Sequence, residues 1–173
     1  FQVSGRALQA TVEAEERDEM QTIGRVLEEL VVEHSLRARL TARLTAGRDS
    51  LGATLANNAQ GKRTTTLSAV VDSAREASEI DIIEVTDSRE VIVYRSQEPE
   101  RHGDRSSSWG VFEALEGASQ MVSDLDGGAL TLRAIEPIRV QDRIVGTVSA
   151  GVRVDNALLE RLGRELGADL FLV

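Results

Sequence analysis

The stretch Ile82–Ser96, "IIEVTDSREVIVYRS", decides the fold of this chain. Two short apolar runs flank a polar turn, and the hydrophobic period around them is two residues, which is typical of β-strands. We predict strands at 80–86 and 91–96, joined by a turn at Asp87–Glu90. Asp87 favours the turn because an aspartate side chain can bond the backbone that follows it. The stretch is therefore expected to be a β-hairpin.

Residues 1–78, upstream of this hairpin, have helical periodicity. Apolar residues spaced by three and four form a seam typical of helices that pair with one another, and the stripe then shifts to a second set. A long helix with few apolar residues usually needs a partner helix, so we expect a homodimer through it. The seam comprises Met20, Ile23, Leu27, Leu30 and His34, and the second set comprises Leu36, Leu40 and Leu44.

Cap residues divide this helical region. Gly47 is expected to end the long helix, and two shorter helices are expected to begin at Asp49 or Ser50 and at Thr64 or Thr65.

Downstream of the hairpin, turn residues separate further elements. "DLDGG" at 124–128 is a strong hairpin signal, and Pro137 favours a bulge or an edge position in its strand. The pattern predicts a loop at 97–106, a helix from Ser106 or Ser107 to Glu116, strands at 118–123, 129–140 and 143–154, a helix at 156–166, and a further strand in "DLFLV" at 169–173.

This order of elements predicts an α+β fold. Consecutive strands with short turns imply an antiparallel sheet, and a five-stranded sheet with a helix crossing between its second and third strands has the PAS-like shape. We expect a helical region at 1–78 and a sheet domain at 79–173, with 167–173 either closing this unit or opening another. Many functions occupy this shape, so the fold alone does not assign one.

Composition excludes several classes of function. The formal charge of −9 argues against nucleic-acid binding, and the absence of cysteine excludes disulfides and thiolate chemistry. The two histidines, His34 and His102, lack neighbours at metal-ligand spacing. Nucleophile, phosphate-loop and dinucleotide signatures are missing, so we expect no enzyme, metal or cofactor. The sequence starts at Phe1 and stops inside an apolar run, so we expect a piece of a longer protein with any membrane spans outside it.

Arg133 is the sharpest candidate for ligand binding. It lies in "LTLRAI" among apolar residues, and strand alternation places Thr131, Arg133 and Ile135 on one side. A buried guanidinium needs an anionic partner, and its planar fork suits a carboxylate. We expect this cation to lack a protein counter-ion and to bind a ligand. The alternatives are a pair with a glutamate of the same chain and a side chain exposed to solvent.

Five further residues are candidate ligand contacts: Tyr94, Ser96, Trp109, Thr131 and Thr147. Tyr94 is expected to share a face with Ile92 and Ser96, and its hydroxyl could bond a ligand. Trp109 lies in the crossing helix that would roof the pocket, and Thr147 could offer a hydroxyl inward. The alternatives are a core role for Tyr94, an anchoring role for Trp109 and simple sheet packing for Thr147.

Several segments, taken in order, resemble the Cache family of PAS-like sensor domains. They are "IIEVTDSREVIVYRS", "FEALEG" at 112–117 and "LTLRAIEPIRVQDRIVGTVSAGV" at 130–152. The resemblance covers about residues 20–166 and is nearest to the single-Cache sensors of citrate and C4-dicarboxylate histidine kinases. It implies an extracytoplasmic module between two membrane spans that senses small molecules and signals through its terminal helices.

The chain departs from those dicarboxylate sensors at several positions. Arg89-Glu90 stands where their turn carries glycine, and Val93 and Ser96 stand where they carry arginine and histidine. Arg133, a strand arginine shortly before the Pro-Ile turn, does match. The resemblance therefore favours a carboxylate-bearing ligand without predicting citrate or fumarate.

Together these features predict the periplasmic sensory domain of an inner-membrane histidine kinase, chemoreceptor or nucleotide cyclase. Two alternatives stay open: a ligand-free module for dimerisation and signal relay, and a cytosolic PAS or GAF-type regulatory domain. Whether the space near Arg133 is a ligand-sized cavity separates the first alternative from a sensor.

Overall fold

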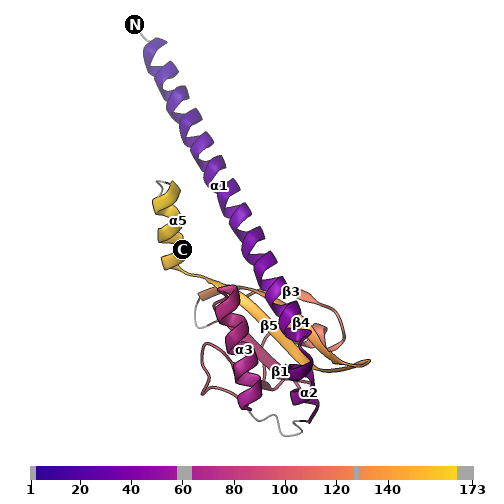
Figure 1. The fold of residues 1–173 in the computed structure, drawn as a ribbon. Helices are drawn as coiled ribbons and strands as arrows, with labels where there is room; N and C mark the ends of the chain where they lie inside the picture. The colour runs from indigo at the N-terminus through magenta and orange to yellow at the C-terminus, as the bar shows by residue number, and fades with distance from the viewer. Residues whose placement is uncertain (1–2, 58–63, 127–128, 167–173) are drawn as a thin grey trace.

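The computed structural model describes residues 3–57, 64–126 and 129–166. It confirms the α+β class, with an antiparallel sheet, one long helix and several short ones (Figure 1). The helices are α1 (Val3–Ala46), α2 (Asp49–Asn57), α3 (Thr65–Ser78), α4 (Trp109–Leu115) and α5 (Asn156–Leu166). The strands are β1 (Ile82–Asp87), β2 (Ile92–Arg95), β3 (Gln120–Asp126), β4 (Ala129–Val140) and β5 (Arg143–Val154).

The five strands form one sheet in the order β2-β1-β5-β4-β3, and every neighbouring pair is antiparallel. The hairpin expected from "IIEVTDSREVIVYRS" is confirmed as β1 and β2. Its turn is closed by Asp87, whose Oδ1 accepts the backbone N–H groups of Arg89 (2.8 Å) and Val91 (3.1 Å). The aspartate side chain thus closes the turn.

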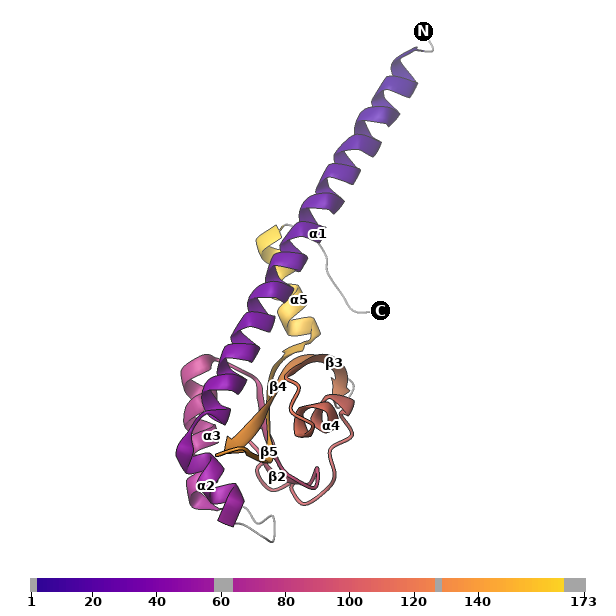
Figure 2. The same ribbon diagram turned by 90° about the vertical axis from the view of Figure 1, so that its right-hand side faces the viewer.

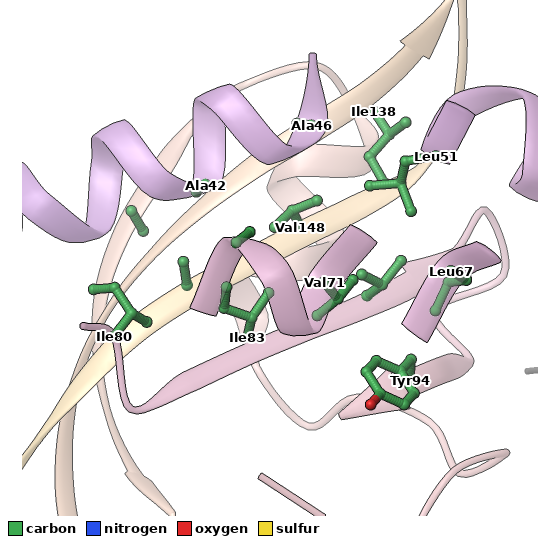
Figure 3. Packing of buried hydrophobic residues seen from close by; sticks show 14 of the residues in the cluster. Ala42, Ala46, Leu51, Leu67, Val71, Ile80, Ile83, Tyr94, Ile138 and Val148 are labelled. Carbon is green, nitrogen blue, oxygen red and sulfur yellow. The ribbon is translucent and has the colours of Figure 1, made fainter. Parts of the chain in front are cut away.

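The two faces of the sheet carry different helices. Figure 2 shows α1, α2 and α3 on one side and α4 on the other. The large core cluster fills the first side, with residues such as Leu51 of α2, Val71 of α3 and Val148 of β5 (Figure 3). A smaller cluster of Val111, Ala114, Val122 and Ile135 holds α4 against the second side. The second side is therefore less fully covered, which leaves room for a pocket.

The C-terminal part of α1 packs on the sheet through small residues. Ala38, Thr41, Ala42, Thr45 and Ala46 are buried against β4 and β5, so the helix lies close to the strands. The second apolar set, Leu36, Leu40 and Leu44, lies on an exposed part of the helix. Burial of small side chains thus fixes α1, and the leucines are left available for another contact.

A β-bulge in the first hairpin changes which residues share a face. Val85 pairs with Tyr94 and Thr86 pairs with Ile92, so Val93 is the extra residue. Because a bulge offsets the alternation of side chains, Ile92 lines the α4 side while Tyr94 belongs to the core on the helical side. The expectation that Tyr94 and Ile92 share a face is therefore wrong.

Pro137 lies where β4 is locally at the edge of the sheet, which is one of the two alternatives expected for it. β4 continues past the last β3 pair, Gln120 with Ile135, so at Pro137 it is paired on one side only, with β5. The register then shifts between Ile138 and Arg139. A residue without an N–H group is tolerated here because β3 no longer needs that donor.

The ends of the described chain leave the sheet in one direction. α1 projects well beyond the sheet, and α5 lies beside it past the same end (Figures 1 and 2). The 44 residues of α1 correspond to a length of about 66 Å at 1.5 Å per residue. No described helix has both the length and the apolar character needed to cross a bilayer. The expected strand at 169–173, and the question of a further module at 167–173, lie outside the described residues.

Candidate ligand-binding pocket

A pocket of about 450 Å³ opens on the sheet face that carries α4. This volume suits a small molecule, since ligand pockets commonly span about 300–1,000 Å³. Its walls are polar, and four arginines face three acidic side chains among the lining residues, a net formal charge of +1. The lining residues are Glu84, Ile92, Arg95, Arg101, Asp104, Arg105, Ser106, Ser107, Ser108, Asp124, Leu125 and Arg133.

The loop between β2 and α4 forms one wall because part of it runs alongside β2. Gly103 N donates to Ile92 O (2.7 Å), and Ile92 N donates to Asp104 O (2.8 Å). Gly103 has a φ of 93°, a conformation that glycine adopts without a steric cost, so the chain can turn back here. This pairing brings Asp104 next to the last residue of β2, Arg95.

Arg95 is held in the pocket by a bidentate ion pair. Its Nη1 donates to Asp104 Oδ1 (2.8 Å) and to the Arg101 carbonyl (2.7 Å), and its Nη2 donates to Asp104 Oδ2 (2.7 Å). These hydrogen bonds from Arg95 lower the pKa of Asp104 from 3.8 to about 2. They also raise the pKa of Arg95. The loop carboxylate therefore stays ionised and fixes the guanidinium in place.

Arg133 lines the pocket as expected, with only 6% of the residue exposed. The expectation that it lacks a protein counter-ion is wrong. Its Nη1 lies 3.2 Å from Glu84 Oε2, and its Nε donates to Thr131 Oγ1 (3.2 Å). The surroundings are nevertheless a pocket and not a solid interior, so the paired guanidinium borders open space.

Thr131 and Thr147, both fully buried, lie on the strands behind the pocket. Thr131 accepts from Arg133 and donates to the Asp124 carbonyl (3.0 Å), so it supports the arginine from the side. Thr147 shares a 2.7 Å hydrogen bond with Thr86 on β1. Both hydroxyls are therefore used in joining strands.

The other three sequence candidates lie away from the pocket lining. Tyr94 packs beside α3 in the core on the opposite face, and its hydroxyl donates to the Asp72 carboxylate (2.8 Å) (Figure 3). Ser96 Oγ accepts from Ile83 N (3.0 Å). Trp109 is 58% exposed at the start of α4. These three positions do not meet Arg133 in one site.

The expectation that the crossing helix α4 roofs the pocket is wrong, because the described lining includes its N-cap Ser108 but no residue of Trp109–Leu115. The helix also begins one or two residues later than expected. Ser108, not Ser106 or Ser107, is the N-cap of α4, and its side chain makes no capping bond. Instead Ser108 Oγ donates to Asp124 Oδ2 (2.7 Å). This bond ties the start of α4 to β3 across the mouth of the pocket.

Sequence reasoning missed the acidic half of the site. Glu84 is 7% exposed and accepts from Gln97 Nε2 (3.0 Å), while its Oε1 lies 3.4 Å from Arg95 Nε. Its position in the apolar run "IIEVTD" could have indicated burial, and a buried carboxylate needs a cation. Asp104 gave no such signal, because only the folded loop brings it to Arg95.

One buried hydroxyl near Glu84 has no hydrogen-bond partner among the described residues. Ser149 is 3% exposed and pairs in register with Glu84 on β1 and Ile135 on β4. A buried hydroxyl without a partner carries a desolvation cost, so the Ser149 hydroxyl is expected to contribute nothing favourable to the stability of the fold.

Within the described chain, no group of three or more His, Asp and Glu side chains is placed to hold a metal ion.

Comparison with solved structures shows the same fold in sensor domains. The E. coli DcuS sensor domain matches with a TM-score of 0.64 at 20% identity, over 79% of this chain and 97% of that one. The V. cholerae histidine kinase DctB sensor domain matches with a TM-score of 0.64 at 12% identity, over 83% of this chain and 56% of that one. The sensory domain of the Campylobacter jejuni chemoreceptor Tlp3, solved with isoleucine bound, matches with a TM-score of 0.60 at 12% identity.

These comparisons also define the extent of the likeness. The chain spans 56% of the DctB chain and 66% of the Tlp3 chain, and 95% of it is covered in the Tlp3 match. Comparison with curated protein sequences gives no match. The family model described as single cache domain 3 matches residues 9–160, which is most of the sequence. The chain therefore belongs to the single Cache domain 3 family, as the resemblance of its hairpin and Pro-Ile turn predicts.

Proposed function

We propose that this chain is the extracytoplasmic sensory domain of a transmembrane receptor and binds a small carboxylate-bearing ligand in the pocket beside α4. The observation that carries the proposal is a pocket of about 450 Å³ lined by two buried arginines, Arg95 and Arg133. A guanidinium recognises a carboxylate through two parallel hydrogen bonds. The net positive charge of the lining also favours an anionic group.

Membership of a sensor family supports the receptor role. DcuS, DctB and Tlp3 are sensor domains, DctB belongs to a histidine kinase and Tlp3 is a chemoreceptor with isoleucine bound. By this likeness we assign the domain to a histidine kinase, a chemoreceptor or a nucleotide cyclase in the inner membrane, with the domain in the periplasm. We expect binding and no catalysis.

The direction of α1 and α5 suits signal transfer. Both helices extend from the same end of the sheet (Figures 1 and 2), and α1 packs on β4, the strand of Arg133. A ligand can shift two arrangements of these helices only through its different affinity for each. We propose that occupation of the pocket changes how β4 sits against α1.

A homodimer through α1 is part of this proposal. Val32, Leu36, Leu40 and Leu44, spaced by four along the helix, are 66%, 56%, 51% and 71% exposed. We call these four residues the α1 ridge. Apolar side chains in such a row favour pairing with a second helix, and a second copy of the chain is the partner that the long helix predicts. In this proposal the homodimer forms through the α1 ridge, and not through the seam of Met20, Ile23, Leu27, Leu30 and His34 that the sequence suggested.

A thermal-shift screen with small mono-, di- and tricarboxylates tests the ligand proposal. A specific binder raises the Tm of the wild-type domain by mass action. Arg133→Gln is expected to abolish the shift because it removes the guanidinium from the pocket. Arg139→Gln, on the same strand with its guanidinium at the Gly117 carbonyl, is the matched control and should keep the shift.

Two results would reject the proposal. If no carboxylate stabilises the wild-type domain, the ligand-free relay module becomes the better account. If Arg133→Gln and Arg139→Gln respond alike, the pocket is not the binding site. The membrane assignment is tested separately in the parent gene, where apolar segments of about 20 residues should flank this chain; their absence would favour the cytosolic alternative.

A further inference from the structure

The pocket contains a buried glutamate, Glu84, although a site that binds only anions needs no acidic residue. Glu84 lies on β1 with 7% of the residue exposed, and its carboxylate spans the two buried arginines. Its Oε2 lies 3.2 Å from Arg133 Nη1, and its Oε1 lies 3.4 Å from Arg95 Nε. The position is held by Gln97, whose Nε2 donates to Oε1 (3.0 Å).

The two buried arginines are therefore already neutralised by protein carboxylates before any ligand arrives. Arg95 and Arg133 supply two positive charges, and Glu84 and Asp104 supply two negative charges, each within 3.4 Å of an opposite charge. Both acids are fixed by hydrogen bonds, Glu84 by Gln97 and Asp104 by Arg95. A ligand carboxylate that enters here must share its arginine with a carboxylate of the protein.

The exposed arginines of the outer part of the pocket compensate the charge of a second ligand carboxylate only weakly. Arg101 is exposed and already lies 3.2 Å from Glu98, and Arg105 is exposed to solvent, where screening is strong. Asp124 adds a further negative charge to the lining beside them. The lining as a whole carries a net formal charge of +1, from four arginines and three acids, so one carboxylate neutralises it and a second leaves an excess.

We infer that Glu84 makes this pocket selective for ligands with one carboxylate over ligands with two. The inference rests on the proposed function and names its ligand class. A single carboxylate shares Arg133 and Arg95 with Glu84, while a second carboxylate meets Glu84 or Asp124 as a like charge. Like charges placed together in a binding site disfavour the partner that carries them, and specific sites often use such a repulsive element. A ligand with an ammonium group gains from the same two acids.

The test compares ligands of equal carbon number that differ by one carboxylate. Butyrate is paired with succinate, and 2-aminobutyrate is paired with aspartate, by calorimetric titration of the wild-type domain. The wild type should bind the one-carboxylate member of a pair at least tenfold more tightly. Glu84→Gln should reduce this preference at least tenfold, chiefly by improving the affinity for the dicarboxylate.

Glu136→Gln is the matched control. It makes the same change in a half-buried strand glutamate that lies outside the pocket lining and bonds Ser119, so the preference should stay as in the wild type. If Glu84→Gln fails to fold, the wild-type affinities for the one-carboxylate and two-carboxylate members of each pair still test the selectivity. A wild type that prefers succinate or aspartate, or a folded Glu84→Gln with an unchanged ratio, overturns this inference and leaves the proposed function standing. A wild type that binds no carboxylate in the wider screen overturns both.

Discussion

Asp104 shows how one ion pair links the pocket to pH. Hydrogen bonds from Arg95 lower the pKa of this carboxyl from 3.8 to about 2. A group whose pKa is lower in the folded state stabilises the fold above the unfolded pKa. The contribution of Asp104 is therefore fully present above about pH 4 and is lost as the pH falls towards 2.

Asp104→Asn should accordingly lower the free energy of unfolding at pH 7, and the difference from wild type should shrink between pH 4 and pH 2. The loss should be about 1 kcal/mol or less, since the side chain is 44% exposed and exposed pairs contribute little. Urea denaturation at several pH values measures it, with Asp142→Asn in the exposed β4–β5 turn as the control. A difference that stays constant down to pH 2 would contradict the assignment.

Two neighbouring hydroxyls on β5 have opposite hydrogen-bonding states. Ser149 Oγ has no partner in the described chain, whereas Thr147 Oγ1 bonds Thr86 Oγ1 at 2.7 Å. Ser149→Ala should leave the free energy of unfolding unchanged or raise it by up to about 1 kcal/mol, because it removes an unsatisfied group.

Thr147→Val should instead lower the stability by about 1–3 kcal/mol, because it leaves the Thr86 hydroxyl buried and unpaired. Urea denaturation of both variants provides the comparison. A large loss for Ser149→Ala would mean that a partner outside the described chain, such as a buried water, satisfies this hydroxyl.

The sequence predicted only part of the site at this scale. Arg133 was recognisable because a charged residue in an apolar strand must be compensated. Its partner Glu84 obeys the same rule in "IIEVTD" and could have been found with it. The Asp104–Arg95 pair could not, since Asp104 follows Arg95 by nine positions and the pairing depends on how the loop between them lies along β2.

At the scale of elements, α4 lies on the same sheet face as the pocket, and its N-cap Ser108 is part of the pocket wall. Gly110 lets this helix lie directly on the sheet, because a Cβ there would come within 2.8 Å of both Ile135 Cδ1 and Val122 Cγ1. Contacts this short force side chains to move or the helix to lift. The packing of one glycine thus fixes α4 on the sheet beside the pocket.

Gly110→Ala should lower the free energy of unfolding by about 1–3 kcal/mol through overpacking, and should weaken carboxylate binding because a shift of α4 moves the pocket wall at Ser106, Ser107 and Ser108 that precedes it. Gly24→Ala is the control, because a Cβ at this helical glycine meets nothing within 4 Å. This change should stabilise α1 by up to about 1 kcal/mol through helix propensity. Equal behaviour of the two variants in thermal denaturation would contradict the packing argument.

The types of the elements were predictable because the spacing of apolar residues changes near Ile80 from three and four residues, as in a helix, to two residues, as in a strand. Cap and turn residues predict the first hairpin, the two later strand pairs, and the helix starts at Asp49 and Thr64–Thr65. The bulge at Val93 does not, since any residue of "VIVY" could be the extra one. That single offset moved Tyr94 from the expected pocket to the opposite core.

At the scale of the whole molecule, the α1 ridge is the surface through which we propose that two copies of the chain pair. Leu36→Gln together with Leu40→Gln should weaken the proposed homodimer at least tenfold, because these apolar side chains would otherwise leave water on pairing. Arg39→Gln, an exposed neighbour in the same turns, should keep the dimer. Sedimentation velocity of the three proteins measures this. A monomeric wild type, or a double variant that dimerises like wild type, would contradict the proposed interface.

The overall architecture followed from the sequence, while the route from ligand to output did not. Alternation, turns and the family resemblance define the sheet and the long helix. Which face of α1 meets the sheet depended on small residues such as Ala38 and Ala42, whose weak hydrophobic signal is easily overlooked beside the leucines. The ridge was therefore identifiable only once the packed face was known.

The claim that a ligand carboxylate meets a guanidinium in the pocket beside α4 is tested most directly by a crystal structure. The wild-type domain would be crystallised with the strongest binder from the carboxylate screen. We predict a ligand carboxylate within about 3 Å of Arg133, on the α4 side of the sheet and beside Glu84. A ligand bound elsewhere on the domain, with only water next to Arg133, would contradict the account.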